Sequence, residues 1–382
     1  MLAPDVPPVL RHTPLHALHL ELGGRMVPFA GTALPLQYRD GVLKEHLWVR
    51  SRCGLFDVSH LGQIVLRPKS GRLADAAIAL ERLVPQDIVA IAPQRQRYGQ
   101  FTTDSGGILD DLMVANCGDH LFLVVNASTR DADAAHLAQH LGSDCSIEVL
   151  TDRALIALQG PQAETVLAKF CNDVETMRFM DVRHLSLAGS DCIVSRSGYT
   201  GEDGFEISVP AGEAEGLARA LLADDDVRPI GLGARDSLRL EAALCLAGDD
   251  IDPGTTVVEA ALQWSIQASR RSGGARAGGF PGAMVILDQL ANGAPRCRVG
   301  LALDGRAPLR KGAVLFTDTT SDQPVGTVTS GGFAPSLNAP IAMGYVEAAL
   351  SAPETRLFAL QRGQHLAVRV TRMPFFTSTS RR

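Results

Sequence analysis

Apolar and polar positions along the chain follow two different periods, and the change between them divides the sequence into two regions. From about residue 13 to residue 267, segments with helical spacing alternate with segments of strand-like alternation, whereas from residue 280 onward almost every segment reads as a strand. Helices are predicted over 13–23, 42–53, 70–83, 131–141, 161–170, 213–222 and 235–246. Strands are predicted over 63–67, 100–103, 108–114, 121–125 and 205–209, and then over 299–303, 313–316, 326–329, 341–346 and 366–370.

Boundary residues mark the first helix and the junction between the two regions. Thr13 is a typical N-cap, Pro14 suits the first helical position and Gly23 suits the C-cap. The junction is 268–279, ASRRSGGARAGG, whose glycine and arginine content is typical of a linker or a mobile loop. We therefore expect an α+β region over 1–267, an Arg/Gly-rich linker over 268–279, and a C-terminal domain over 280–382. Short strands with Gly and Pro between them predict that this last domain is a small β-barrel or jelly roll.

Composition and charge exclude several classes of protein. Of the 382 residues, 46% are hydrophobic and 20% are charged, which is typical of a globular chain and not of a disordered one. Lys and Arg total 36 against 42 Asp and Glu, and the resulting net charge of −6 argues against nucleic acid as the main partner. No apolar run approaches the ~18 residues of a membrane-spanning helix, so no membrane contact is expected.

The N-terminus and the cysteines indicate the compartment. Three prolines and Asp5 precede the first basic residue, Arg11, which fits neither a secretory signal nor an Arg-rich transit peptide. The seven cysteines are odd in number, scattered and without a C-x-x-C pair, so we expect neither a zinc site nor a disulfide framework. These features suit a reducing compartment, and a bacterial-type cytoplasm is the expected location.

Two adjacent carboxylates lie in the predicted strand 108–114. Neighbouring strand residues point to opposite faces, so Asp110 shares a face with Leu112, and Asp111 shares the other with Met113. Both faces are apolar, so at least one carboxylate must be partly buried. Burial raises a carboxyl pKa and suits acid–base or charge-stabilising work. The alternative is that one Asp caps a neighbouring turn while the other reaches solvent at a sheet edge.

Two glycine-rich segments carry further candidate residues. Over 197–206, SGYTGEDGFE, the glycines allow the backbone to approach a ligand closely, and Glu206 opens the predicted strand 205–209. Taken alone, this pattern favours an ordinary hairpin over a binding segment. Over 231–241, a glycine turn leads into a helix with Arg235 in its first turn, where a cation is disfavoured by the helix dipole and an anionic partner is expected. The alternative is an Arg–Glu pair on a solvated helix face.

Other motifs give weaker evidence of function. His12, His16 and His19 have a spacing that could mimic a metal-binding face, but no acidic or cysteine ligand is nearby, and we expect solvated histidines and no metal. The sequence has no G-x-S-x-G, no Walker loop and no G-x-G-x-x-G after a strand. Hydrolase, NTPase and dinucleotide-binding functions therefore lose their main support.

A series of short segments, in order along the chain, resembles one known family. They are PFAG (28–31), FDVSH (56–60), GGILDDL (106–112), VVN (124–126), QGPQA (159–163), SGYTGEDGFE (197–206), GLGARDSLRLEA (231–242), GFPGA (279–283), RKG (310–312), VGTVTSGGFAPSL (325–337) and MPF (373–375). Each segment is moderately specific, whereas the ordered set is highly so. The chain resembles the aminomethyltransferases, the tetrahydrofolate-dependent T proteins of the glycine cleavage system, over about 13–375.

The resemblance implies a fold and an activity. The fold would be a three-domain cloverleaf, with two intertwined α+β folate-binding subdomains and a C-terminal β-barrel around a central folate channel. The implied activity moves the methylene carbon from an aminomethyl group on the lipoyl arm of H protein to tetrahydrofolate. The products would be 5,10-methylene-tetrahydrofolate and ammonia, and the lipoylated H protein would be the partner.

The resemblance also implies roles for particular residues. Asp111 would be the catalytic acid that orients the attacking folate nitrogen and stabilises the developing positive charge. Glu206 would accept two hydrogen bonds from the edge of the pterin ring. The family's other folate contacts correspond here to Tyr98, Asn126, Tyr199 and Arg235. Arg306 and Arg310 would neutralise the glutamate tail of folate or face the H protein.

Two rival functions share this resemblance. One is a related folate-dependent demethylase that takes another one-carbon donor. The other is a non-catalytic folate-binding protein of iron–sulfur cluster maintenance, which would bind folate without turnover. Such a protein usually carries a cysteine-bearing motif that this sequence lacks. A screen of one-carbon donors separates the first rival, and turnover with lipoylated H protein separates the second.

Overall fold

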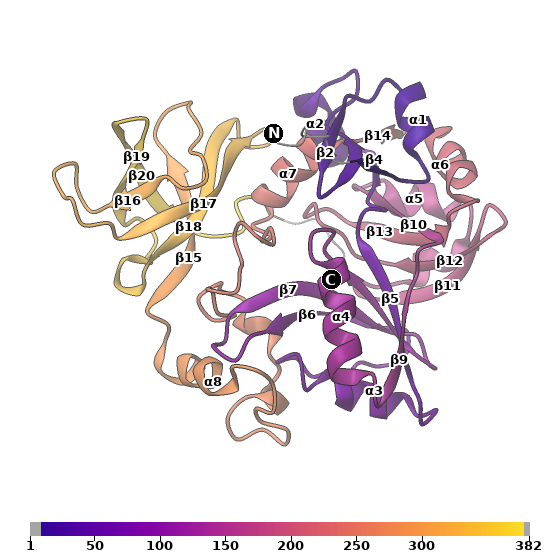
Figure 1. Cartoon of the computed structure of the whole chain (residues 1–382). Helices are drawn as coiled ribbons and strands as arrows, with labels where there is room; N and C mark the ends of the chain where they lie inside the picture. Colours follow the sequence, from indigo (N-terminus) through magenta and orange to yellow (C-terminus); the bar gives the residue numbers. More distant parts are fainter. Residues whose placement is uncertain (1–8, 378–382) are drawn as a thin grey trace, which may run out of the picture.

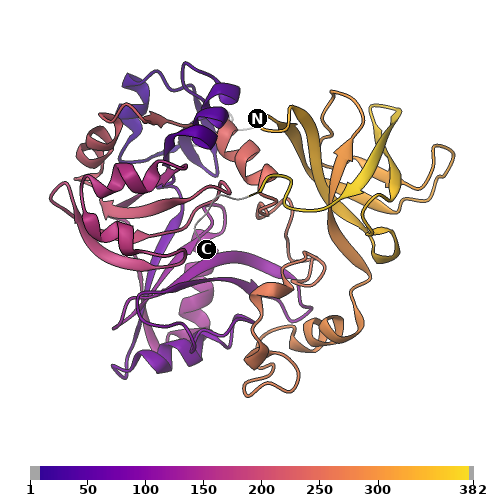
Figure 2. The same cartoon turned by 180° about the vertical axis from the view of Figure 1, so that it is seen from behind.

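A computed structural model describes residues 9–377 and shows three lobes (Figure 1). Two lobes each contain a β-sheet with helices, and the third is a β-barrel at the C-terminal end. In both views the lobes surround a central region to which α7 (Leu232–Glu241) also belongs (Figures 1 and 2). The predicted α+β cloverleaf with a C-terminal barrel is confirmed.

Within residues 9–377, the strands form three sheets and one closed barrel. A six-stranded sheet has the order β11 (Val182–Leu187), β12 (Ser190–Ser195), β13 (Gly204–Pro210), β10 (Arg153–Gln159), β4 (Cys53–Asp57) and β14 (Val227–Pro229). A five-stranded sheet has the order β6 (Gln96–Thr102), β7 (Ile108–Asn116), β8 (Leu121–Val125), β5 (Gly62–Pro68) and β9 (Cys145–Val149). A small sheet has the order β1 (Arg11–His12), β3 (Thr32–Pro35) and β2 (Met26–Phe29).

The remaining elements are helices and the strands of the barrel. Besides α7, the helices are α1 (His16–Glu21), α2 (Val42–Ser51), α3 (Leu73–Leu80), α4 (Arg130–Leu141), α5 (Ala163–Ala168), α6 (Ala214–Leu222) and α8 (Ala283–Asn292). The closed barrel runs β15 (Arg296–Leu303), β18 (Ala339–Glu347), β17 (Gly326–Ala334), β16 (Val314–Phe316), β19 (Arg356–Gln361) and β20 (Gln364–Thr371).

The chain passes repeatedly between the two large sheets, and this makes the first two lobes intertwined. It leaves the six-stranded sheet after β4, builds β5 to β9 of the five-stranded sheet, and returns at β10. Val65 and Phe122 from one sheet then pack against Val182 and Ile193 from the other. Each sheet therefore depends on the other for its position.

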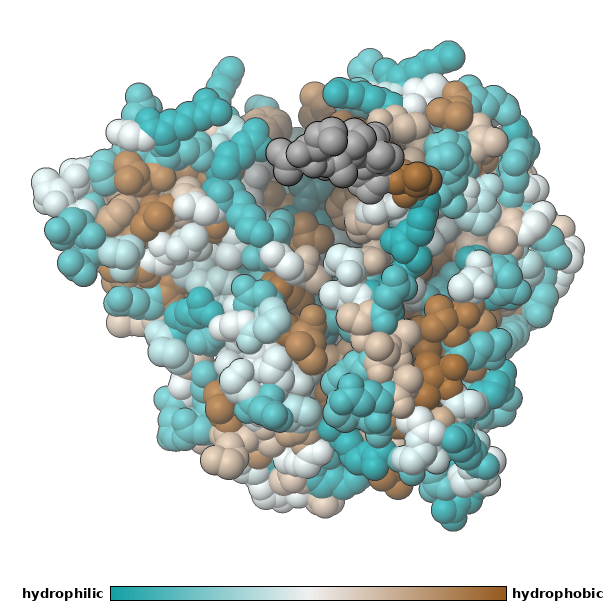
Figure 3. All heavy atoms as spheres, in the orientation of Figure 1, coloured by the Kyte–Doolittle hydropathy of each residue, from teal (hydrophilic) through white to brown (hydrophobic). Residues whose placement is uncertain are grey.

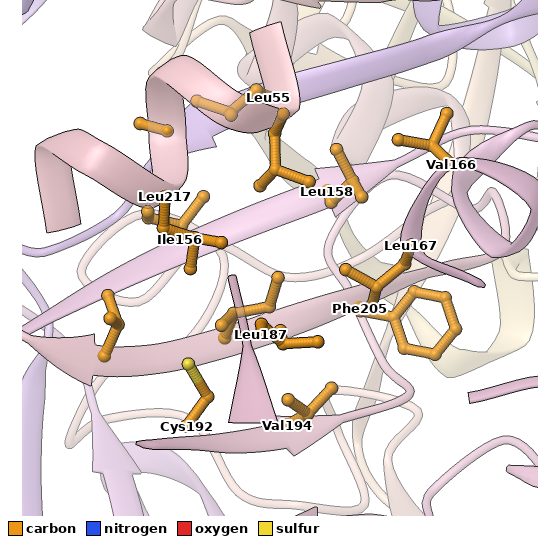
Figure 4. Packing of buried hydrophobic residues seen from close by; sticks show 14 of the residues in the cluster. Leu55, Ile156, Leu158, Val166, Leu167, Leu187, Cys192, Val194, Phe205 and Leu217 are labelled. Carbon is orange, nitrogen blue, oxygen red and sulfur yellow. The ribbon is translucent and has the colours of Figure 1, made fainter. Parts of the chain in front are cut away.

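Strand β10 shows why the six-stranded sheet is the interior of its lobe. Its alternate residues Ile156 and Leu158 point into the cluster beneath α5 and α6 (Figure 4), whereas Leu155 and Ala157 point into the cluster beneath α2 and α7. A strand covered on both faces is apolar at every position, and this strand, RALIALQ, is nearly so. It therefore lacks the alternation that marks a half-buried strand.

Several predicted elements are corrected. Helix α8 occupies a segment that the sequence pattern predicted as part of an all-strand region, and its Ile286 is fully buried against residues such as Ile108 and Cys245. The first helix begins at His16 with Leu15 at the N-cap position and no side-chain cap hydrogen bond, so the predicted Thr13 cap is wrong.

The predicted linker 268–279 is held by ion pairs. Its residues Arg270 and Arg276 both bind Glu81, at 3.3 and 3.0 Å, and Arg276 also pairs with Asp87. The barrel strands begin at Arg296. The predicted division into 1–267, 268–279 and 280–382 remains a prediction.

Within residues 9–377, no helix is long and apolar enough to cross a membrane. The face shown in Figure 3 is largely hydrophilic, and apolar residues occur there in small groups. Over the same residues, no group of three or more His, Cys, Asp or Glu side chains could hold a metal ion. All seven cysteines are free thiols.

Candidate functional site

The two adjacent carboxylates lie on β7 with opposite orientations. Asp110 is 1% exposed and occupies the side of the strand on which Leu112 and Val114 enter the core beneath α3 and α4. Asp111 is half-buried and lies on the side of Leu109 and Met113. The predicted alternation is confirmed. It leaves one carboxylate inside the lobe and the other partly open to solvent.

Asp111 is held by one residue from each neighbouring strand. Tyr98 on β6 donates its hydroxyl to Oδ2 of Asp111 at 2.7 Å, and Asn126, directly after β8, donates Nδ2 to Oδ1 at 2.5 Å. Burial, and then the neighbouring Asp110 carboxylate, raise the pKa of Asp111 to about 6. Near neutral pH the group is therefore mostly ionised, yet close enough to its pKa to exchange a proton.

A second group of site residues comes from the six-stranded sheet and α7. The guanidinium of Arg235 lies over the Tyr199 ring, 4.8 Å from its centroid, and Ser197 donates its hydroxyl to Oε2 of Glu206 at 2.9 Å. Nη1 of Arg235 is buried without a hydrogen-bond partner in the described chain. Burial lowers the pKa of Arg235, and the carboxylate of Glu206 opposes that effect. A buried guanidinium nitrogen that has no hydrogen-bond partner and lies near a carboxylate is suited to an incoming polar ligand.

The two groups face the same region. Burial, and among its charged neighbours Asp111, raise the pKa of Tyr199, so the tyrosine is within electrostatic reach of the first group. Glu206 is linked to the same region by its charge interaction with Arg235. The structure thus brings together six predicted residues that are distant in sequence: Tyr98, Asp111, Asn126, Tyr199, Glu206 and Arg235. Their roles remain predictions.

Other predicted residues lie elsewhere. Arg306 and Arg310 are exposed on the connection between β15 and β16, and their contact with folate or a partner remains a prediction. His19 is buried and not solvated as predicted, because its ring nitrogens bind Asp57 and Tyr38, each at 2.8 Å. It ties α1 to the six-stranded sheet.

The sequence did not reveal two residues near the site. Trp264 is 63% exposed and stacks on Tyr98 with ring centroids 5.6 Å apart. His60 is buried beside Phe29 with an unpartnered Nδ1, and burial, followed by the charge of Arg235, lowers its pKa to about 4. His60 ends the FDVSH segment, which carries only part of the family resemblance, and nothing in the sequence relates Trp264 to Tyr98.

Comparisons with known proteins agree with this arrangement. Residues 15–270 match the family described as GCVT N-terminal domain, and residues 296–377 match the glycine cleavage T-protein C-terminal barrel domain. The chain is 43% identical to the mitochondrial aminomethyltransferase of Dictyostelium discoideum, over 96% of this chain and 92% of that protein. It is 46% identical to the mitochondrial aminomethyltransferase of Homo sapiens, over 96% of this chain and 90% of that protein.

A solved structure gives the same result. The crystal structure of glycine cleavage system aminomethyltransferase T from Bartonella henselae matches with a TM-score of 0.89 and 41% identity, over 98% of this chain and all of that one. These matches define a multidomain transferase, and the polar residues of the candidate site come from two of its sheets and from α7. The chain belongs to the aminomethyltransferase family, the T proteins of the glycine cleavage system.

Proposed function

We propose that the chain transfers the methylene carbon of an aminomethyl group, carried on the lipoyl arm of H protein, to tetrahydrofolate, with release of ammonia. The observation that carries this proposal is Asp111, a half-buried carboxylate with a raised pKa, held by Tyr98 and Asn126 on the side of β7 that is partly open. The family membership supports the reaction type. It favours aminomethyl transfer over a demethylase or a non-catalytic folate-binding protein.

The residues present suit a folate. A pterin ring offers a ring N–H and an exocyclic amine side by side, which a carboxylate such as Glu206 can accept together. The unpaired Nη1 of Arg235 would donate to a folate oxygen or nitrogen, and this contact would satisfy a buried donor. The faces of Tyr98 and Tyr199 offer apolar packing for flat rings.

Asp111 would act on the reacting centre. Its carboxylate would orient the attacking nitrogen of tetrahydrofolate and stabilise the positive charge that develops as the carbon changes partner. With a pKa of about 6, roughly nine-tenths of Asp111 is ionised at about pH 7, as this role requires. The hydrogen bonds from Tyr98 and Asn126 keep the carboxylate in one orientation.

Partner and compartment also belong to this proposal. The lipoylated H protein is the proposed donor of the aminomethyl group. We propose no role for a metal, a nucleic acid or a membrane. The free thiols support a reducing compartment, and we propose the cytoplasm. The relatives named above are mitochondrial proteins, so fractionation of the source cells decides between the two compartments.

The test is turnover. Purified protein is mixed with tetrahydrofolate and aminomethyl-loaded lipoyl H protein, and the release of ammonia and of methylene-tetrahydrofolate is measured. Asp111→Asn should remove most turnover while folate affinity stays close to wild type. Glu206→Ala should weaken folate binding by roughly 1.5–3 kcal/mol, as expected for a charged hydrogen-bond pair.

The matched control is Asp131→Asn, whose carboxylate is 85% exposed on α4 and should not matter. Equal losses of turnover and affinity in both Asp111→Asn and Glu206→Ala would contradict this division of roles. Folate binding without turnover in the wild-type protein would reject the transferase.

A further inference from the structure

Asp133 is a buried carboxyl group that the proposed function leaves unused. It lies on α4 in line with Leu137 and Leu141, at positions i, i+4 and i+8 of the stripe that packs on the five-stranded sheet. It is 4% exposed, and no N–H or O–H donor of the described residues reaches its Oδ2. Because a buried carboxylate without partners is costly, its protonation state needs a physical cause.

The cause is a second buried carboxyl group. The side chain of Asp110, which is 1% exposed on β7, lies within hydrogen-bonding reach of the Asp133 carboxyl group. Two carboxylates in contact cannot both be ionised at neutral pH, so the pair holds one proton. Both oxygens of Asp110 already accept hydrogen bonds, Oδ2 from the backbone N–H of Asn126 at 3.1 Å and Oδ1 from its Nδ2 at 2.9 Å. The proton therefore belongs on Asp133, which donates it to Asp110.

Asp110 in turn orients the amide that holds Asp111. The Nδ2 of Asn126 contacts Oδ1 of Asp110 at 2.9 Å, and it also contacts the backbone oxygen and Oδ1 of Asp111, at 3.1 and 2.5 Å. An amide between two carboxylates can present only its NH2 group to them. A continuous path of hydrogen bonds thus runs from Asp133 through Asp110 and Asn126 to the partly open carboxylate of Asp111.

We propose that Asp133 is a positioning residue for the transfer reaction. As a protonated acid it donates to Asp110, fixes the Asn126 amide, and thereby holds the Asp111 carboxylate in the orientation that receives the folate nitrogen. This inference rests on the proposed function of Asp111. Asp133 lies on a helix behind the sheet and acts through Asp110 and Asn126, so a list of substrate contacts would not include it.

The charges around Asp133 set the pH above which this hydrogen-bonded arrangement is lost. Burial, and then the carboxylate of Asp110, raise the pKa of Asp133 to about 8, with a further contribution from Asp111 and an opposing hydrogen bond from Thr129. Above that pH a second negative charge lies against Asp110. The hydrogen bond between the two carboxyl groups is then lost, and Asn126 and Asp111 lose their fixed orientation.

Among the described residues, the groups that contribute most to the pKa of Asp133 include no cation. Strands β5 and β9 contribute Ile64, Leu66 and Cys145 to the core that α4 covers, and burial raises the pKa of Cys145, which keeps it a neutral thiol. One turn along α4, His136 packs edge-on against Phe101, and burial lowers its pKa, so the ring is neutral as well. The ionisation of Asp133 is therefore felt mainly by Asp110 and Asp111.

The experiment compares Asp133→Asn with Asp133→Ala in the full-length protein. The asparagine keeps a neutral N–H donor toward Asp110 but cannot ionise, whereas the alanine leaves Asp110 without that donor. At about pH 7, kcat for aminomethyl transfer should stay within about threefold of wild type in Asp133→Asn and fall by about tenfold or more in Asp133→Ala. The wild-type loss of kcat above about pH 8 should be absent or displaced upward in Asp133→Asn, and retained in the control Asp131→Asn.

A second measurement needs no substrate. Infrared titration of the free protein should show the C=O band of a protonated carboxylic acid near neutral pH, lost as the pH rises past about 8 and absent from Asp133→Asn. A band that persists in Asp133→Asn, together with a wild-type alkaline profile in that variant, would overturn the proposal. Because the band is observed without turnover, a failure of the proposed transferase function is distinguishable from a failure of the shared proton.

Discussion

The buried carboxylate of Glu241 joins the barrel to the rest of the molecule, and its removal should destabilise the whole chain. Glu241 lies at the end of α7 with a fully buried side chain. Its Oε2 accepts from Nη2 of Arg50 at 2.8 Å and lies 3.1 Å from Nε2 of His46, both on α2. Its Oε1 accepts from the backbone N–H of Ser336, in the connection between β17 and β18, at 2.9 Å.

The expected magnitude for Glu241→Gln follows from two independent considerations. Removing one partner of a buried ion pair leaves the other charge uncompensated and costs about 3–5 kcal/mol. Burial acts to raise the pKa of Glu241, but His46, Ser336 and Arg50 outweigh it and lower the pKa from 4.5 to about 2. At about 1.4 kcal/mol for each pKa unit, this change corresponds to about 3 kcal/mol of folding free energy. We therefore expect Glu241→Gln to lower the free energy of unfolding by about 3 kcal/mol near neutral pH.

Urea unfolding at several pH values measures this loss. Because the folded-state pKa is depressed, the contribution of Glu241 is complete above about pH 5 and disappears as the pH falls toward 2. The difference between wild type and Glu241→Gln should therefore narrow in acid. The control is Glu354→Gln, which breaks an exposed pair with Arg369 and should cost less than about 1 kcal/mol.

A loss below about 1 kcal/mol at neutral pH would refute this reasoning, because it would mean that the pair contributes no more than an exposed one. A loss of the expected size that did not change between about pH 5 and pH 2 would also refute it, since charge would then not be the cause.

Three further predictions concern the candidate site. Burial and Asp110 raise the pKa of Asp111 to about 6, so kcat/KM should fall about tenfold per pH unit below that value as the Asp111 anion is lost. A kcat/KM profile that stays flat down to about pH 5 would exclude Asp111 as the ionising group. Tyr98→Phe removes the hydroxyl that donates to Asp111 but keeps a ring that stacks on Trp264. The loss of one hydrogen bond should lower kcat about fivefold. An unchanged kcat would show that this hydrogen bond does not contribute to the reaction. Arg235→Met should weaken folate binding measured by calorimetry, since its buried Nη1 would otherwise bind the ligand, and unaltered affinity would place Arg235 outside the site.

The strand that carries Asp111 was predictable because its pattern is local. Alternation over 108–114 placed Asp110 and Asp111 on opposite faces, and the structure shows this arrangement. The identity of the face that opens toward the site was not predictable. It depends on α4 covering one side of the sheet, which is a contact between segments distant in sequence.

The burial of Asp133 and the helical structure of α8 were missed for different reasons. Asp133 precedes Leu137 and Leu141 by four and eight residues, and this helical spacing could have indicated that Asp133 is buried. Nothing in the sequence indicated that Asp110 is its neighbour. The α8 sequence, AMVILDQLAN, mixes β-branched and helix-forming residues, so the strand-rich pattern around it favoured the wrong assignment. In the folded protein, the burial of Ile286 against Ile108 stabilises this segment as a helix.

Helix α7 connects the barrel to the site, and this connection has a testable consequence. Its first turn carries Arg235 beside Tyr199, and its last residue, Glu241, anchors Ser336 of the barrel. Between them, Arg239 binds Asp250 at 2.7 Å and Ser330 of the barrel at 3.0 Å.

If these anchors also set the position of the helix, Glu241→Gln should weaken folate binding although Glu241 does not face the site. If instead the apolar contacts of Ala234 and Leu238 with the six-stranded sheet suffice, affinity will be unchanged while stability still falls. Folate titration of the folded variant in the absence of urea distinguishes these two cases. We expect weaker binding, because a buried charge network tolerates less displacement than an apolar contact of similar size.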